Sequence, residues 1–118
     1  MTVKASILTT LVVAALVLAA APAFAREPQV GRWAVSTQSC SAGGDKGTAP
    51  LTVTDVTLHW GAETCTIGKM YKADRALYIE GRCSNGGMMM RHPITLTMKG
   101  ARLAVTWNGA HTELQRCP

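Results

Sequence analysis

The most unusual local run in the chain is Met88-Met89-Met90-Arg91-His92, which places thioether and imidazole groups within five residues. Thioether and imidazole ligands suit Cu(I). Successive residues of a strand point to opposite faces, so these side chains can meet one ion only from an irregular loop, which the preceding Gly86-Gly87 permits. The candidate metal ligands are Met88, Met90 and His92, and the alternative is that the methionines pack in the core or a loop.

The four cysteines are the second set of residues with chemical potential: Cys40, Cys65, Cys83 and Cys117. Their spacing contains no C-x-x-C pair, which disfavours a zinc site. The alternative is two disulfides, for which four cysteines allow three pairings.

The sequence contains no recognisable set of catalytic residues. There is no G-x-S-x-G, and cysteines held in bridges cannot serve as nucleophiles. A pair of carboxylates for glycoside hydrolysis can be drawn from almost any small protein. Here the choices would be Asp55, Glu63, Asp74, Glu80 and Glu113. We therefore expect no catalytic residues, no cofactor and no enzyme activity.

The first 25 residues have the composition of a cleaved signal peptide. Lys4 precedes an apolar run over residues 5–21, and Ala23-Phe24-Ala25 forms an A-x-A cleavage site. Cleavage would leave 93 residues, 26–118, which suffice for a single domain with no stable membrane insertion. Export to the periplasm or the medium would place the cysteines in an oxidising compartment, which favours disulfides.

The charge of the exported chain is moderately positive. Loss of Lys4 leaves 11 basic against 7 acidic side chains, a net charge of +4. The basic residues form no block, so they indicate either a solvated surface or a basic face for an acidic partner. Nucleic acid is not an expected partner outside the cytosol.

Short alternating runs separated by turn residues predict an all-β fold, a small antiparallel meander closed or nearly closed into a barrel. About seven strands are expected, over residues 30–38, 51–60, 64–71, 76–83, 94–98, 103–107 and 111–116. A phase shift at Asp55 predicts a β-bulge in the second strand. Asn108-Gly109 is the strongest hairpin turn signal.

The meander also predicts which residues become neighbours. Folding the central hairpin about Asp74 places Cys65 opposite Cys83, and counting strand directions leaves Cys40 with Cys117. The same count places Trp33, Trp60 and Trp107 together at one end. There they would either fill the floor of the barrel or form an aromatic ligand surface.

The opening Gly31-Arg32-Trp33 resembles the G-x-W of the first strand in lipocalins and related small barrels. That resemblance implies that a late arginine, Arg116, lies near Trp33. The whole pattern is similar to small exported bacterial proteins with an early G-x-W, a central C-T-I strand at residues 65–67 and a terminal R-C-P. This similarity implies no activity.

The sequence thus favours a non-enzymatic binding module of the cell envelope. Its partner would be a protein or a small apolar ligand, with the surface of Trp33, Trp60 and Trp107 as the candidate ligand site. A periplasmic copper-binding protein using residues 88–92 is the alternative. A small hydrolase or a structural envelope component is a third possibility.

Overall fold

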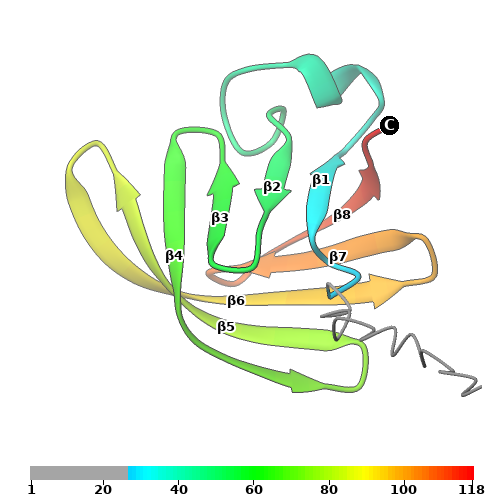
Figure 1. Ribbon diagram of the computed structural model, residues 1–118. Coiled ribbons are helices and arrows are strands. Elements are labelled where there is room, and N and C mark those ends of the chain that lie inside the picture. The colour runs from blue at the N-terminus through cyan, green and yellow to red at the C-terminus, as the bar shows by residue number, and fades with distance from the viewer. Residues whose placement is uncertain (1–26) are drawn as a thin grey trace, which may run out of the picture.

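The computed structural model describes residues 27–118, so the predicted signal at 1–25 lies outside the described residues. These residues form a closed antiparallel barrel in which every strand pairs with its neighbours along the chain and β1 also pairs with β8 (Figure 1). The elements are β1 (Gly31–Ala34), the 3-10 helix η1 (Gln38–Ser41), β2 (Leu51–Val53), β3 (Thr57–Trp60), β4 (Glu63–Ala73), β5 (Ala76–Asn85), β6 (Met88–Lys99), β7 (Arg102–Trp107) and β8 (Ala110–Arg116).

The predicted all-β barrel is confirmed, with eight strands rather than about seven. A meander whose first and last strands also pair antiparallel needs an even number of strands, because direction alternates around the barrel. The extra strand comes from residues 51–60, which were expected to form one bulged strand. Residues 54–56 instead turn the chain, because the Thr54 hydroxyl accepts hydrogen bonds from the amides of Val56 and Thr57, at 3.3 and 2.9 Å.

Tight turns explain why the strands follow one another so closely. Five hairpins have two-residue loops, as the registers Trp60↔Glu63, Ala73↔Ala76, Asn85↔Met88, Lys99↔Arg102 and Trp107↔Ala110 show. The first loop residue has a positive φ in each, from 49° at Asn108 to 62° at Gly86. Such turns match the twist of an antiparallel pair. Asn108-Gly109 is among them, as expected.

Apolar side chains from all eight strands fill the barrel interior. β4 contributes only its first part, because its residues from Gly68 onward are exposed. The most deeply buried are Trp33, Leu51, Leu58, Ile94, Leu96, Leu103, Val105 and Leu114. They belong to one continuous core cluster. Close packing of this kind makes the barrel a filled core rather than an open ligand cup.

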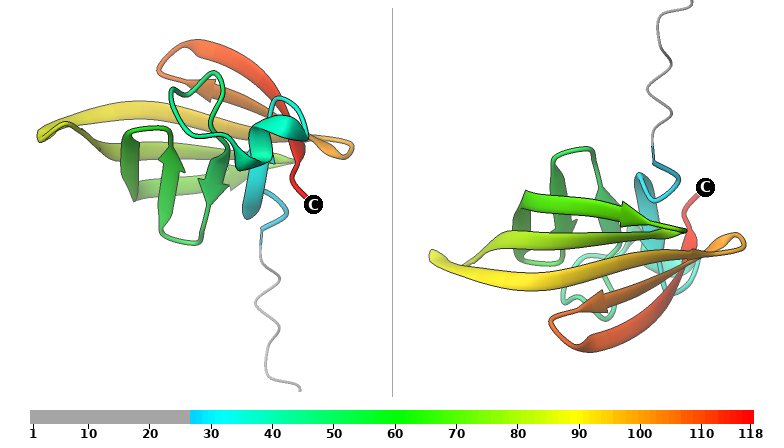
Figure 2. Two further views of the ribbon diagram at one scale, coloured as in Figure 1. Left: turned by 90° about the horizontal axis from the view of Figure 1, so that it is seen from above. Right: turned by 90° about the horizontal axis from the view of Figure 1, so that it is seen from below.

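The longest strands, β4, β5 and β6, extend past the rest of the barrel, and the β5–β6 hairpin projects at one side (Figure 2). β5 and β6 pair from Asn85↔Met88 to Ala76↔Thr97. The β6–β7 ladder spans only Ile94↔Trp107 to Lys99↔Arg102. The two ladders of β6 are therefore unequal in length.

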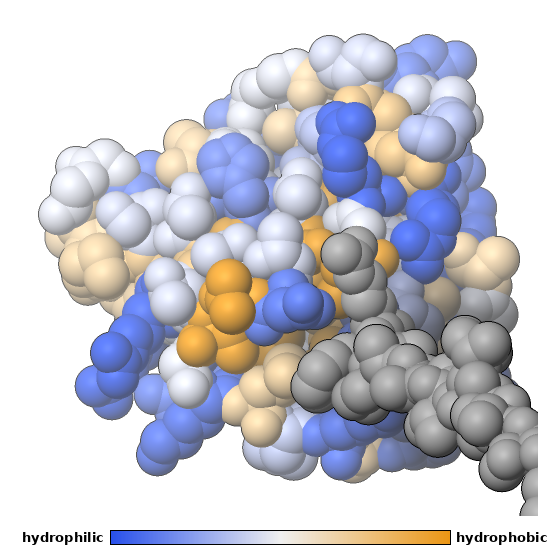
Figure 3. All heavy atoms as spheres, in the orientation of Figure 1, coloured by the Kyte–Doolittle hydropathy of each residue, from blue (hydrophilic) through white to orange (hydrophobic). Residues whose placement is uncertain are grey.

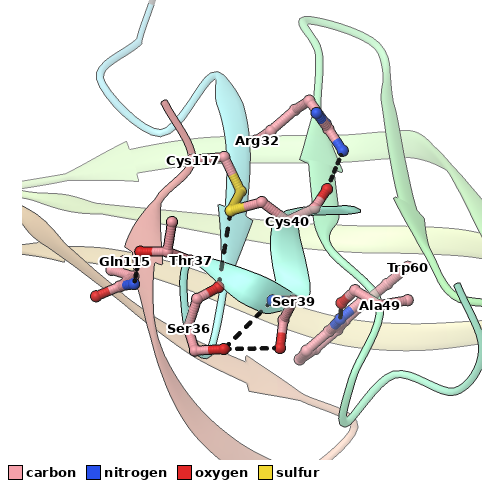
Figure 4. The surroundings of a disulfide bond; sticks show 9 residues. All are labelled: Arg32, Ser36, Thr37, Ser39, Cys40, Ala49, Trp60, Gln115 and Cys117. Carbon is pink, nitrogen blue, oxygen red and sulfur yellow. Dashed lines mark hydrogen bonds between the residues drawn. A yellow bond between two sulfur atoms is a disulfide. The ribbon is translucent and has the colours of Figure 1, made fainter. Parts of the chain in front are cut away.

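Two disulfides join Cys40 to Cys117 and Cys65 to Cys83, and both predicted pairs are confirmed. The strand count placed Cys117 at the wrong end of the barrel, because β8 ends beside the start of β1, where Arg116 pairs with Trp33. Cys65 and Cys83 are direct cross-strand partners on β4 and β5. Cys40 lies on η1, which folds back beside the end of β8 (Figure 4). There the Arg32 guanidinium donates to the Cys40 carbonyl at 2.7 Å, and the Cys117 amide donates to the Arg32 carbonyl at 2.8 Å. The two bonds are consistent with an oxidising environment.

The β1–β8 seam is closed by an arginine stacked on a tryptophan. The Arg116 guanidinium lies 4.2 Å from the centre of the Trp33 ring and donates to the carbonyls of Val30 and Pro28. Gly31 permits this approach, because a Cβ there would lie 2.5 Å from Arg116 Nη1 and its φ is +146°. Arg116 therefore lies beside Trp33, as the G-x-W resemblance implies.

Within residues 27–118, no helix combines the length and the apolar character needed to cross a membrane.

Replacing Cys40 and Cys117 together by alanine should lower the free energy of unfolding by about 4 kcal/mol, because this disulfide closes a long loop in the unfolded chain. The cysteines are 77 residues apart. Urea unfolding measures the change. Thr37→Ala is the matched control, since it removes one exposed hydrogen bond to Gln115 in the same corner. A loss below about 1 kcal/mol in the double variant would contradict the stapling role.

Candidate functional site

The three tryptophans do not form the common surface that the strand count predicted. Trp60 and Trp107 pack edge to face, with ring centres 5.4 Å apart. The Trp33 indole donates instead to the Gln29 carbonyl at 2.9 Å, and the Gln29 amide reaches the Arg75 carbonyl in the β4–β5 turn. That turn is at the opposite end of β4 from Glu63, which Trp107 contacts.

The separation follows from the additional turn at residues 54–56, which reverses the direction expected for every later strand. Trp60 and Trp107 therefore lie together at the end of the barrel opposite Trp33. All three tryptophans are also buried, at 4% exposure or less. They therefore serve as packing in the core, and the structure does not display them as an exposed aromatic ligand surface.

The predicted copper ligands lie on one regular strand. Residues 88–92 pair with β5 without interruption, so the irregular loop that a shared ion would require is replaced by a β-ladder. Residues two positions apart along a strand lie on the same face, and their Cα atoms are about 6.6 Å apart. Met88 and Met90 are 68% and 52% exposed, whereas His92 is buried beside Glu63. Met88, Met90 and His92 thus lie in a row along one face of β6.

The outer face of β4, β5 and β6 carries a groove of about 410 Å³. Cross-strand register places Lys69, Glu80 and Pro93 in one row and Tyr71, Tyr78 and Thr95 in the next row on the same face. Tyr71 and Tyr78 stack with ring centres 5.0 Å apart and remain exposed. This face offers a fixed aromatic platform, which is a common element of protein-binding surfaces.

The same outer face is basic. Arg82 on β5 pairs with Arg91 on β6, in the row of outward side chains next to that of Glu80. Lys69 on β4 pairs with Glu80 on β5. Arg91 approaches Glu80 at 3.6 Å, but Arg91 is 72% exposed and so remains accessible. Three cations against one carboxylate give this face a net positive charge, which suits acidic groups on a partner.

A second candidate site lies at the barrel end where Trp60 and Trp107 meet, and it centres on Glu63. The Glu63 carboxylate is 6% exposed. Its Oε1 accepts the Trp107 indole N–H at 2.9 Å and lies 3.5 Å from His92 Nε2. Its Oε2 lies 2.8 Å from the Lys46 ammonium. We call Glu63, Lys46, Trp60, Trp107 and His92 the Glu63 cluster.

Lys46 reaches the Glu63 cluster from the loop over residues 42–50, not from the barrel wall. Its ammonium also lies 5.0 Å from the centre of the Trp107 ring. The Ala49 carbonyl, on the same loop, accepts the Trp60 indole N–H at 2.9 Å. Gly61 completes the contact, because a Cβ there would lie 2.9 Å from the Gly44 carbonyl. The loop therefore covers this end of the barrel.

The pKa of Glu63 is set by two opposing effects, burial of the carboxylate and its contacts with donors and positive charge. Burial by itself raises the pKa, but hydrogen bonds from Lys46 and Trp107 and the charges of Lys46 and His92 outweigh it. The net result is a pKa below the usual value of 4.5. Glu63 is therefore ionised at neutral pH although it is almost excluded from water.

The residues around Glu63 lack the free ligands that a metal ion needs. Among residues 27–118, one group of side chains has the spacing of metal ligands, namely Glu63, Cys65 and Cys83. The two cysteines are joined in a disulfide, so they offer no thiolate to an ion. One carboxylate is left, and its oxygens already face Lys46 and Trp107.

Sequence reasoning missed the Glu63 cluster because burial, not residue type, makes it unusual. In the sequence Glu63 is one of several carboxylates, and Lys46 lies between Gly44 and Gly47 with no motif around it. The available signal is that Trp60 and Glu63 flank Gly61-Ala62, the two-residue turn between β3 and β4.

No family model, no curated protein and no solved structure matches this chain.

Glu63→Gln should reduce the free energy of unfolding at pH 7 by about 1–3 kcal/mol, because charge-assisted hydrogen bonds to a buried carboxylate are lost. The folded pKa is depressed, so the stabilisation by Glu63 is complete above pH 4.5 and is lost as pH falls through the folded pKa. The variant should therefore show a shallower loss of stability in acid than the wild type.

Urea midpoints measured between about pH 3 and 7 test this dependence. Glu113→Gln is the matched control, because Glu113 is 44% exposed and makes only surface ion pairs with Lys99 and Arg102. The pH dependence of Glu113→Gln should follow the wild type. Identical acid profiles for Glu63→Gln and the wild type would contradict the assignment.

Proposed function

We propose that this protein is an exported, non-enzymatic binding module of the cell envelope that binds a protein partner through the free edge of β6. The observation that carries the proposal is the unequal pairing of that strand. Residues 88–92 pair with β5, whereas the ladder with β7 spans residues 94–99. An unpaired strand edge is a template for a strand of another chain.

Exposed apolar side chains make this edge suited to binding. Met88, Met89 and Met90 are 68%, 69% and 52% exposed, and apolar atoms reach the surface at the projecting end of the hairpin (Figure 3). Methionine side chains adapt to varied partner surfaces. The edge therefore combines main-chain donors and acceptors with flexible apolar contacts.

The β5–β6 turn indicates which backbone groups face the partner. Gly86 and Gly87, with φ of 62° and 89°, form a two-residue turn of the I′ type. The flanking Asn85 and Met88 then form the hydrogen-bonded pair that closes the hairpin, and alternate residues direct their N–H and C=O away from β5. Those residues are Met89 and Arg91.

Charge favours an acidic partner segment. Arg91 lies on the free edge, and the neighbouring outer face adds Arg82 and Lys69. The filled interior supports a protein rather than an enclosed small apolar ligand, since core side chains occupy the space within the strands. Export is supported by the composition of residues 1–25 and by the two disulfides.

Met89→Pro should abolish partner binding while leaving the barrel folded, because proline removes one outward N–H and is tolerated at a strand edge. Met89→Ala is the matched control, since it shortens the side chain and keeps the N–H. The oxidised protein and both variants are immobilised and exposed to envelope extract. A partner retained by the wild type and by Met89→Ala, but not by Met89→Pro, is the expected result.

Salt provides a second measurement on the same complex. Retention should fall as ionic strength rises, because the basic face contributes screened attractions. Recovery of chaperones alone, or of a protein that Met89→Pro retains equally, would contradict strand addition at this edge.

A further inference from the structure

The Lys46 ammonium occupies a position that has the features of a ligand site. It belongs to a covering loop, while the groups around it belong to the barrel: Glu63 begins β4, Trp60 ends β3 and Trp107 ends β7. The ammonium lies 2.8 Å from Glu63 Oε2 and 5.0 Å from the centre of the Trp107 ring. A carboxylate and an indole face are the two groups that proteins most readily combine around an organic cation.

The two oxygens of Glu63 have different roles. Oε1 is held by the barrel, through the Trp107 indole at 2.9 Å and His92 at 3.5 Å. Oε2 has Lys46 as its ion-pair partner. The barrel thus orients the carboxylate with one oxygen and presents the other to whatever cation lies over Trp107. The orienting contacts remain when Lys46 leaves.

Space for a ligand exists on both sides of Lys46. One hollow of about 300 Å³ is lined by Lys46, Trp60 and Trp107, together with residues of the β7–β8 turn. Another of about 260 Å³ is lined by Lys46, Trp60 and Glu63, together with Asp45, Ala62 and Asn85. Because Lys46 and Trp60 line both hollows, withdrawal of the Lys46 side chain would join them beside the Glu63 carboxylate.

Lys46 can leave without unfolding the barrel. Its side chain is 37% exposed, so the ammonium has a direct path to water. The loop remains fixed to the barrel through the Ala49 carbonyl, which accepts the Trp60 indole N–H, and through backbone packing on Gly61. Release of the side chain therefore requires rotation about the lysine bonds alone.

We propose that Glu63, Trp60 and Trp107 form a binding site for a primary alkylammonium group, and that Lys46 fills this site in the absence of ligand. A primary ammonium fits because Glu63 Oε2 requires an N–H donor, which a quaternary ammonium lacks. The alkyl chain would lie along the indoles. The site adjoins the proposed partner edge, because Asn85 lines one hollow and pairs with Met88, and His92 contacts Glu63. The two proposals nevertheless rest on different groups, a carboxylate with two indoles and a strand edge, so either proposal can fail without the other.

The test compares the wild type, Lys46→Ala and Lys46→Ala/Glu63→Gln in titrations with n-butylammonium, followed by tryptophan fluorescence and calorimetry. Lys46→Ala should bind about tenfold more tightly than the wild type, because the wild-type site is available only when Lys46 has left it. The double variant should lose the binding. Tetramethylammonium, the control cation, should bind none of the three with comparable affinity.

Nα-acetyl-lysine-N-methylamide in a parallel titration identifies the source of the ammonium. Binding as tight as that of n-butylammonium assigns a lysine side chain of a protein, and binding of n-butylammonium alone assigns a free amine. The proposal is overturned if folded Lys46→Ala binds neither probe. It is also overturned if Glu63→Gln leaves the affinity of Lys46→Ala unchanged, because binding would then be independent of the carboxylate.

Thermal unfolding keeps the proposal testable if Lys46→Ala is unstable. A ligand that binds only the folded state raises the unfolding temperature with concentration. n-Butylammonium should therefore stabilise or refold Lys46→Ala and Lys46→Met, and should not do so for the double variant. If n-butylammonium raises the unfolding temperature of neither Lys46→Ala nor Lys46→Met, the proposal is overturned, and Lys46 only neutralises Glu63.

Discussion

An ionised carboxylate removed from water needs compensating charge and hydrogen bonds, and Glu63 imposes this requirement on one end of the barrel. The barrel supplies Trp107 and His92 at one oxygen, and the loop over residues 42–50 supplies Lys46 at the other. Trp60 packs on Trp107 and donates to the Ala49 carbonyl, so the aromatic pair and the loop are joined at the same end of the barrel as the carboxylate. The proposed site for an external ammonium group uses this same carboxylate, in place of Lys46.

Closure at the β1–β8 seam is the second constraint. β1 has only four residues, so its pairing with β8 needs help from outside the ladder. The Cys40–Cys117 disulfide and the stack of Arg116 on Trp33 provide that help from opposite sides of β1. On the other side of the barrel, β4, β5 and β6 are the longest strands, and residues 88–92 of β6 pair with β5 alone.

Local signals predicted much of this fold. The turn at Asn108-Gly109, the alternation along β5 and the mirror spacing of Cys65 and Cys83 depend on neighbours in sequence, and each was confirmed. The reversal at residues 54–56 was hidden because a tight turn and a bulge both shift the apolar phase by one residue. That single difference reversed the end assigned to Trp60 and to Trp107. The Glu63 cluster depends on contacts between distant segments, which composition and spacing do not encode.

Glu63 is ionised at the covered end of the barrel because contacts with Lys46 and Trp107 lower its pKa. The most direct measurement is a ¹³C NMR titration of the Glu63 side-chain carboxyl carbon, in the wild type and in Lys46→Met. We expect the wild-type pKa to lie below 4.5 and to rise in Lys46→Met, because burial then acts with less opposition. A wild-type pKa at or above 4.5, or one that Lys46→Met leaves unchanged, would contradict the account.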